Sequence, residues 1–113
     1  LITASSIDRS RKQSESKDSE MAEKRSVKVN VKGRVQGVGF RYSTQRQAQR
    51  LGVKGWVRNE RDGSVTVVIE GPKAAVDEMV SWLHEGPGFA NVADLNLQEY
   101  PYEGRYSSFT VQP

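Results

Sequence analysis

Hydrophobic and polar residues are distributed unevenly along this chain of 113 residues. Residues 1–26 contain few apolar side chains, with no strand or helix spacing, and are rich in Ser, Lys, Arg, Asp and Glu. Such a segment cannot bury enough apolar surface to offset the entropy that it would lose on ordering. We therefore predict a disordered N-terminal tail over residues 1–26 and one folded domain over residues 27–113. Met21, just before this domain, is a candidate native start.

After residue 26 the apolar residues alternate between strand spacing and helix spacing. Period-two alternation and apolar content predict three strands, at 27–32, 54–59 and 65–69. A fourth strand is predicted around Leu95 and Leu97, and a short final strand from Phe109 to Val111. Helical spacing predicts a helix from Phe40 to Leu51 that Gly52 stops. A second helix is expected to take Pro72 as its first position and to end at residues 86–88.

The order of these predicted elements defines a fold class. Residues 60–63, Glu-Arg-Asp-Gly, have the composition of a hairpin turn, so the second and third strands should pair antiparallel. The full order is strand, helix, strand, strand, helix, strand. It predicts an α+β, ferredoxin-like βαββαβ sandwich, with an antiparallel sheet and both helices on one face.

Composition narrows the possible chemistry. The chain has no cysteine, which excludes disulfides, thiolate catalysis and cysteine-based zinc sites, and favours a cytoplasmic location. No apolar run is long enough for a membrane span or a signal peptide, so no membrane partner is expected. From residue 27 onward, 11 Lys and Arg face 9 Asp and Glu, a mild preference for anions that suits a small anionic substrate.

A glycine-rich segment, with Gly33, Gly37 and Gly39, lies between the first predicted strand and the first predicted helix. Glycine lets consecutive amides turn inward as an anion-binding nest, and the helix N-terminus adds partial positive charge. Arg41 follows at the start of that helix and can hold two phosphate oxygens. Taken alone, the glycines are more typical of a tight turn than of a phosphate site. The spacing fits neither a P-loop nor a dinucleotide fingerprint.

Two longer strings are more specific: Gly33-Arg-Val-Gln-Gly-Val-Gly-Phe-Arg41 and Gly55-Trp-Val-Arg-Asn59. Together they resemble the two signatures of the acylphosphatase family, and the spacing between them and the Gly71-Pro72 helix start match as well. The resemblance extends from about Val27 to Val111. Gly39 occupies a position that varies in the family. Because the site would use its backbone amide, we expect no loss of function there.

The resemblance implies hydrolysis of carboxyl–phosphate anhydrides, with Arg41 binding the phosphoryl group and Asn59 positioning the attacking water. An acyl phosphate has a good leaving group, a carboxylate of pKa about 4 to 5, so charge stabilisation and an in-line water should suffice. No metal and no cofactor are expected, and the protein should be a monomer whose partner is a small-molecule acyl phosphate. The phosphate would be held by the backbone amides of Gln36, Gly37, Val38, Gly39 and Phe40.

The same residues also allow other interpretations. Asn59 precedes a hairpin turn, where Asn is frequent, so without the resemblance it would be interpreted as a turn residue. RNA-recognition modules share this order of elements but stack bases on aromatic residues of the first and third strands. Here the outward positions hold none, so nucleic acid is not expected. A non-catalytic binding or regulatory module of the same family stays open. The outward positions are Lys28, Asn30, Lys32, Thr66, Val68 and Glu70.

Overall fold

The computed structural model describes residues 23–113, so the predicted tail lies almost entirely outside the described residues. Within the described range the first strand begins at Lys24, three residues earlier than predicted. The elements are β1 (Lys24–Arg34), α2 (Phe40–Leu51), β2 (Lys54–Asn59), β3 (Val65–Pro72), α3 (Lys73–Glu85), β4 (Asn91–Tyr100) and β5 (Phe109–Gln112). The predicted α+β, ferredoxin-like order is confirmed.

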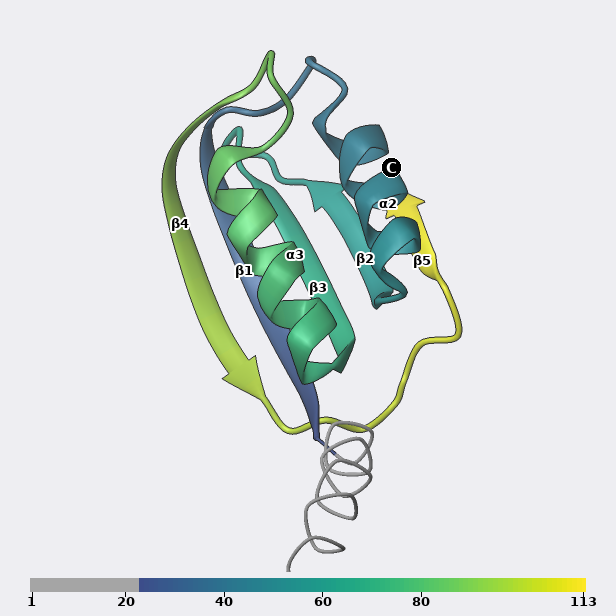
Figure 1. Ribbon diagram of the computed structural model, residues 1–113. Coiled ribbons are helices and arrows are strands. Elements are labelled where there is room, and N and C mark those ends of the chain that lie inside the picture. Colours follow the sequence, from purple (N-terminus) through teal and green to yellow (C-terminus); the bar gives the residue numbers. More distant parts are fainter. Residues whose placement is uncertain (1–22) are drawn as a thin grey trace, which may run out of the picture.

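The sheet has five strands in the order β4-β1-β3-β2-β5 (Figure 1). β1 pairs antiparallel with β3 and β4, and β2 pairs antiparallel with β3. β5, however, pairs parallel with β2, so the sheet is mixed, and the predicted antiparallel pairing holds for β1, β2, β3 and β4. The reason for the parallel pairing is the connection after β4. Residues 101–108 carry the chain from one edge of the sheet to the other, where β5 enters in the same direction as β2.

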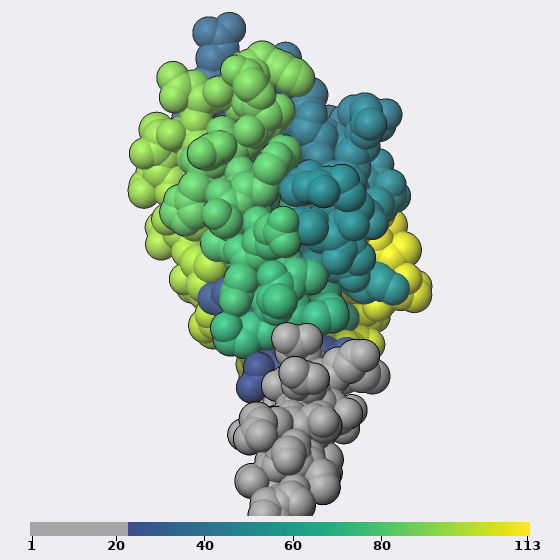
Figure 2. Space-filling model, viewed as in Figure 1, coloured from purple at the N-terminus to yellow at the C-terminus, as the bar shows by residue number. Residues whose placement is uncertain are grey.

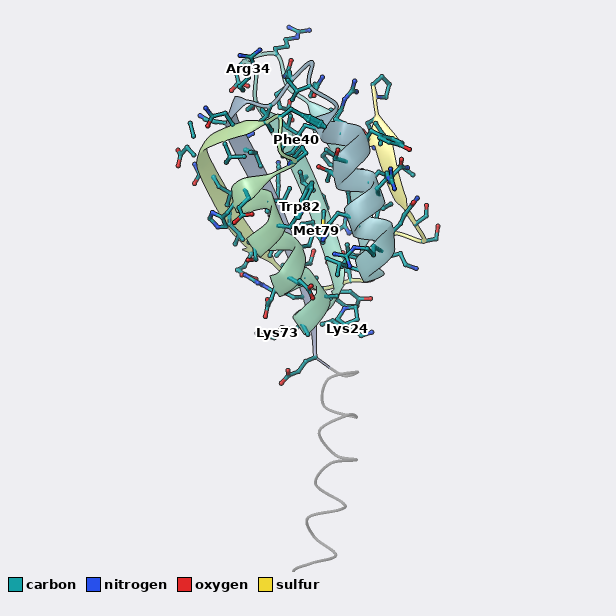
Figure 3. The ribbon with its side chains drawn as sticks, turned by 45° about the horizontal axis from the view of Figure 1, so that its top comes forward. Lys24, Arg34, Phe40, Lys73, Met79 and Trp82 are labelled. Atoms are coloured by element: carbon teal, nitrogen blue, oxygen red, sulfur yellow. The ribbon has the colours of Figure 1, made fainter. Side chains whose placement is uncertain are left out.

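Both helices cover one face of the sheet, as predicted, and the core lies between them and the strands (Figures 1 and 2). Strand alternation directs every second side chain of β1 and β3 into this core. α2 contributes Phe40, and α3 contributes Met79, with Trp82 6.2 Å from Phe40 between ring centroids. Figure 3 shows these three side chains in the interior, between the two helices. The core residues of β1 and β3 are Val27, Val29, Val31, Val65, Val67 and Ile69.

The helix ends follow their local signals with one exception. Gly52 ends α2 in the left-handed conformation and donates its backbone N–H to the Ala48 carbonyl at 2.8 Å, which confirms the predicted stop. Pro72 was expected as the first residue of α3 but has a ψ of 139° and belongs to β3. Because that ψ is an extended value, the helix starts one residue later, at Lys73. Among residues 23–113 no helix is long and apolar enough to cross a bilayer.

The sheet face opposite the helices is less exposed than its polar sequence suggests. Thr66 and Glu70 point away from the helices, as predicted, yet they are only 3% and 2% exposed. Residues 101–108 cover part of this face, and the Tyr106 backbone N–H donates to Glu70 Oε2 at 2.9 Å. Aromatic side chains are also present here, from Trp56 of β2 and from Tyr100 of β4. The outward positions without aromatic residues are those of the first and third strands only.

Candidate active site

The glycine-rich loop between β1 and α2 is anchored at both ends by buried side chains. Val35 is fully buried and Phe40 is 1% exposed, while Val38 packs against the core from the middle of the loop. Between these anchors Gly37 and Gly39 both have a φ of 75°, in the left-handed region where a Cβ is unfavourable. The loop therefore alternates apolar anchors with exposed glycines, which leaves its backbone accessible on one side.

The backbone amides of this loop are free of protein partners. Within residues 23–113, no amide from Gln36 to Phe40 donates a hydrogen bond to a backbone or side-chain acceptor. Gly39, the N-cap of α2, supplies no side-chain cap, and the first turn of α2 carries no acidic residue. An uncapped helix N-terminus beside free amides is favourable for an anion.

Arg41 lies in the first turn of α2 and is held by β5, the edge strand next to β2. Its Nη1 donates to the backbone carbonyl of Gln112, at the end of β5, over 2.7 Å. A guanidinium has five N–H donors in a rigid fork, so this bond fixes the side chain and leaves other donors unused. Positive charge at a helix N-terminus opposes the helix dipole, and a bound anion would relieve that conflict.

Asn59 is the last residue of β2 and lies on the same side of the sheet as the helices. Its alternation with the buried Val57 places both side chains toward α2. Asn59 Oδ1 is buried and accepts no hydrogen bond from any described residue. Buried acceptors of this kind are rare in native proteins and deserve a functional explanation.

A cavity of about 350 Å³ brings the predicted residues together. Gly37, Gly39, Phe40, Arg41 and Asn59 all line it, whereas Gln36 and Val38 do not. Arg41 is the only charged residue of the lining, so the cavity is positive. The lining also includes four residues that were not predicted as site residues: Val35, Tyr42, Gln45 and Val111.

Helical spacing could have identified Gln45, because it lies one turn after Arg41 on the same face of α2. Gln45 Nε2 donates to the Phe109 carbonyl at 3.3 Å, so both polar residues of this face bind the backbone of β5. Tyr42 is 61% exposed at the rim. Val111 had no local signal, since its place in the cavity depends on the pairing of β5 with β2.

The side chain of Gln36 connects the glycine loop to the turn that follows β2. Its Nε2 donates to the carbonyls of Glu60 and Ser64, at 2.7 and 2.8 Å, and so joins the glycine loop to the turn between β2 and β3. Asn59 directly precedes that turn. The side chain of Gln36 is therefore a structural bridge between the glycine loop and the turn after β2. From the sequence, a role was predicted for the Gln36 backbone amide only.

Replacing Gln36 with Leu is expected to lower the free energy of unfolding by about 2 kcal/mol, because two part-buried hydrogen bonds are lost at about 1 kcal/mol each. Urea unfolding of the full chain measures this change. Gln49→Leu, on the exposed side of α2, is the matched control and should change stability by less than about 0.5 kcal/mol. Equal stability of the Gln36 variant and the unaltered chain would contradict the bridging role.

The carboxylate of Glu60 is close to the cavity in sequence but does not line it. Glu60 follows Asn59, and a hydrogen bond with Thr66, together with Arg58, lowers the pKa of Glu60 below its usual value. Thr66 and Arg58 both lie on the sheet face opposite the helices, and Arg58 Nη2 is 3.2 Å from Glu60 Oε2. The negative charge of Glu60 is thus paired with Arg58 on the sheet face opposite the helices, and the cavity stays positive.

The fold and this cavity define a class: a small ferredoxin-like α+β domain with a positive pocket at a glycine-rich loop between a strand and a helix. The chain belongs to the acylphosphatase family, whose sequence model matches residues 27–111. A curated acylphosphatase of Rubrobacter xylanophilus is 54% identical over 86 residues, which are 76% of this chain and 78% of that protein. The resemblance inferred from the two signature strings is confirmed.

Solved structures agree with this assignment. An acylphosphatase from Bacillus subtilis superposes with a TM-score of 0.75 at 35% identity, over 79% of this chain and 99% of that one. An acylphosphatase from Coxiella burnetii gives a TM-score of 0.74 at 38% identity, over 79% of this chain and 93% of that one. The family model, over residues 27–111, spans both signature strings.

Proposed function

We propose that this chain hydrolyses the carboxyl–phosphate anhydride bond of acyl phosphates to a carboxylate and inorganic phosphate. Curated relatives named acylphosphatase, up to 54% identical, support the activity. The observation that carries the proposal for the site is the convergence of Gly37, Gly39, Arg41 and Asn59 on one cavity. These residues come from two strings, one that ends in the first turn of α2 and one that forms the end of β2.

The loop and Arg41 bind the phosphoryl group in this proposal. Amides of residues 36–40 have no acceptor among the described residues, and the Arg41 guanidinium is fixed by the Gln112 carbonyl. Both sets of donors are oriented before the substrate arrives, so no reorganisation is needed as charge develops on the phosphoryl oxygens. The Gln36 and Val38 side chains point elsewhere, and only their amides would take part.

Asn59 orients the attacking water. Its unpaired Oδ1 is a neutral acceptor that can bind a water O–H and direct the water oxygen at phosphorus. The water oxygen forms a bond to phosphorus, the bond from phosphorus to the acyl oxygen breaks, and the carboxylate leaves with its electron pair. The water proton passes to a phosphoryl oxygen. A carboxylate of pKa about 4 to 5 leaves without an acid, which explains why no general acid is required.

A non-catalytic module of the same family is the competing candidate. The presence of both Arg41 and Asn59 in one cavity favours catalysis over it. A cytoplasmic location, favoured by the absence of cysteine, and a monomeric state are part of the proposal.

Hydrolysis of benzoyl phosphate by the full chain tests the function, followed by the loss of ultraviolet absorbance with a chelator present. We expect turnover well above the rate without protein, unchanged by the chelator, because amides, Arg41 and Asn59 carry the proposed step. A folded chain that leaves benzoyl and acetyl phosphate intact would favour the non-catalytic module. Loss of turnover on adding the chelator would contradict the proposed route.

A further inference from the structure

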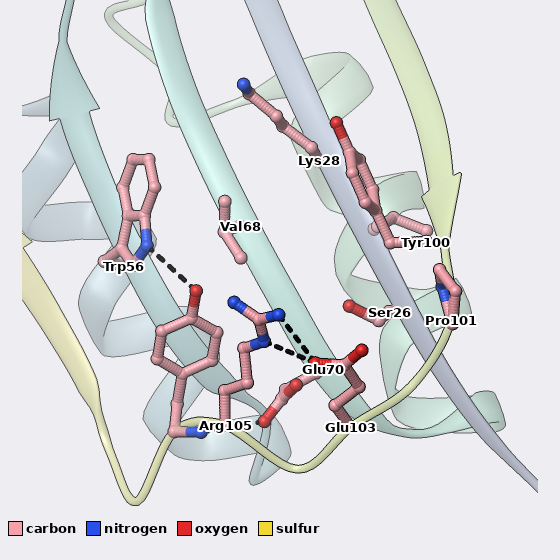
Figure 4. Close-up of a pocket in the computed structure, with 11 residues that line it drawn as sticks. Ser26, Lys28, Trp56, Val68, Glu70, Tyr100, Pro101, Glu103 and Arg105 are labelled. Atoms are coloured by element: carbon pink, nitrogen blue, oxygen red, sulfur yellow. Dashed lines mark hydrogen bonds and ion pairs between the residues drawn. The ribbon is translucent and has the colours of Figure 1, made fainter.

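The sheet face opposite the helices holds a second cavity, of about 260 Å³, that the hydrolytic site does not use. Its walls come from β1, β2, β3 and β4 and from the segment after β4 (Figure 4). The apolar part is formed by Trp56, Val68, Tyr100 and Tyr106. Tyr106 is held in place by two contacts, from the Trp56 indole N–H to its hydroxyl at 3.4 Å and from its backbone N–H to Glu70.

Glu70 is the unusual member of this lining. It is only 2% exposed, and its Oε2 accepts the Tyr106 amide, while no described residue donates to its Oε1. Burying a carboxylate is costly unless a positive charge or several donors compensate for it. A single neutral amide is a weak partner for a charge of this kind. The fold therefore maintains a buried carboxylate whose one hydrogen bond from a described residue comes from a neutral amide.

Neither cation of the lining forms an ion pair with Glu70 among residues 23–113, although Glu103 first and Glu70 more weakly raise the pKa of Arg105. Arg105 is paired with Glu103, with 2.6 Å between Arg105 Nη2 and Glu103 Oε1, and its side chain is 64% exposed. Lys28 is exposed, and Figure 4 shows its amino group toward one end of the cavity, with Glu70 toward the other. Charges in contact with water screen a buried carboxylate poorly and are themselves well hydrated.

We propose that this cavity is a binding site for a small organic cation, an ammonium or guanidinium ion attached to a flat apolar body. The cation pairs with Glu70, and the apolar body lies against Trp56, Val68 and Tyr100. Aromatic walls favour a cation next to them and also exclude water from the ion pair. The volume suits a molecule of about one ring and a short chain, since pockets for drug-sized ligands begin at about 300 Å³.

Binding of benzylamine to the uniformly ¹⁵N-labelled full chain tests the site. The indole N–H signal of Trp56 should shift along a saturable curve, with a dissociation constant of about 1 mM or lower. The Trp82 indole, on the helix side against Phe40, should not move and serves as the internal control. Benzyl alcohol, which has the same ring without the charge, should bind at least about tenfold more weakly.

Glu70→Gln separates an ion-pair site from a merely apolar cavity. It should weaken benzylamine binding at least about tenfold, because the charge-assisted contact is lost. Glu78→Gln, the same change at an exposed position of α3, should bind like the unaltered chain. Both variants should hydrolyse benzoyl phosphate within about twofold of the unaltered rate, since surface and distant changes rarely alter a remote site. Retained turnover also reports that each variant is folded.

A third variant keeps the proposal testable if Glu70→Gln does not fold. Tyr100 is 47% exposed at the rim, so Tyr100→Leu should fold and bind benzylamine more weakly, with turnover retained. The proposal is overturned if benzylamine does not shift the Trp56 indole, or if benzyl alcohol binds as tightly. It is also overturned if a folded Glu70→Gln variant binds benzylamine like the unaltered chain. If Glu70→Gln does not fold, the same result for Tyr100→Leu overturns it.

Discussion

Replacing Arg41 with Gln should lower kcat/KM for benzoyl phosphate by at least about 10³-fold, the range seen when an arginine that stabilises a transferring phosphoryl group is removed. Gln is neutral and cannot present a fork of donors, so both the charge and the bidentate geometry are lost. Initial rates over a range of benzoyl phosphate concentrations, for the full chain and the variant, measure the change.

The variant should remain folded. The bond from Arg41 to the Gln112 carbonyl is its main tie to the rest of the protein, and its loss should cost about 1 kcal/mol. Arg50→Gln is the matched control, because Arg50 is an exposed arginine in the last turn of the same helix. It removes the same charge from α2 without touching the cavity, and its kcat/KM should stay within about twofold. An Arg41 variant as active as this control would disprove the assignment of Arg41.

Replacing Asn59 with Ala should lower kcat by about 10²-fold and leave KM nearly unchanged, since misplacing a reacting group typically has an effect of that size. In the proposed mechanism Asn59 contacts the water and not the phosphoryl group, so the effect should appear in turnover. Steady-state kinetics with benzoyl phosphate separates the two parameters, and inorganic phosphate as a competitive inhibitor gives an independent measure of affinity.

Asn96→Ala is the control for this variant. Asn96 is exposed on β4, far from β2 in the strand order, and its loss should change neither parameter. An Asn59 variant whose kcat and KM change by similar factors would indicate a binding or structural role. A variant that unfolds at lower urea concentration with normal kcat would mean that Asn59 matters only for the turn that follows it.

Local sequence signals were sufficient for most of the fold. Alternating valines identified β1 and β3, and helical spacing with Gly52 fixed the extent of α2. These signals are local because strand and helix periods depend on neighbouring residues. The direction of β5 was not predictable in this way. Its parallel pairing with β2 depends on a connection that crosses the whole sheet, and nothing within Phe109–Gln112 encodes where that connection ends.

The same distinction between local and long-range signals applies to the site. Gly37, Gly39, Arg41 and Asn59 belong to two short strings, and their convergence could be predicted from family resemblance and helix position. The Gln112 carbonyl that fixes Arg41 and the Gln36 bridge to the turn could not, because both are contacts between segments distant in sequence. Their roles became visible only with the tertiary structure.

The burial of Glu70 could not be predicted from the sequence either. Its strand position predicts the face on which it lies, and on that point the prediction was right. Its burial depends on Tyr106, whose amide reaches Glu70 from the segment between β4 and β5. That segment has no regular hydrogen-bond ladder and therefore no periodic signal.

The central claim is that the loop amides and Arg41 form one phosphoryl site, and a titration of the ¹⁵N-labelled full chain with inorganic phosphate tests it directly. We expect the amide signals of Gly37, Val38, Gly39 and Phe40 to shift together. Their common dissociation constant should match the competitive inhibition constant of phosphate, and the shifts should disappear in the Arg41→Gln variant. Phosphate that inhibits hydrolysis while these amides stay unchanged, or that shifts them equally without Arg41, would contradict the account.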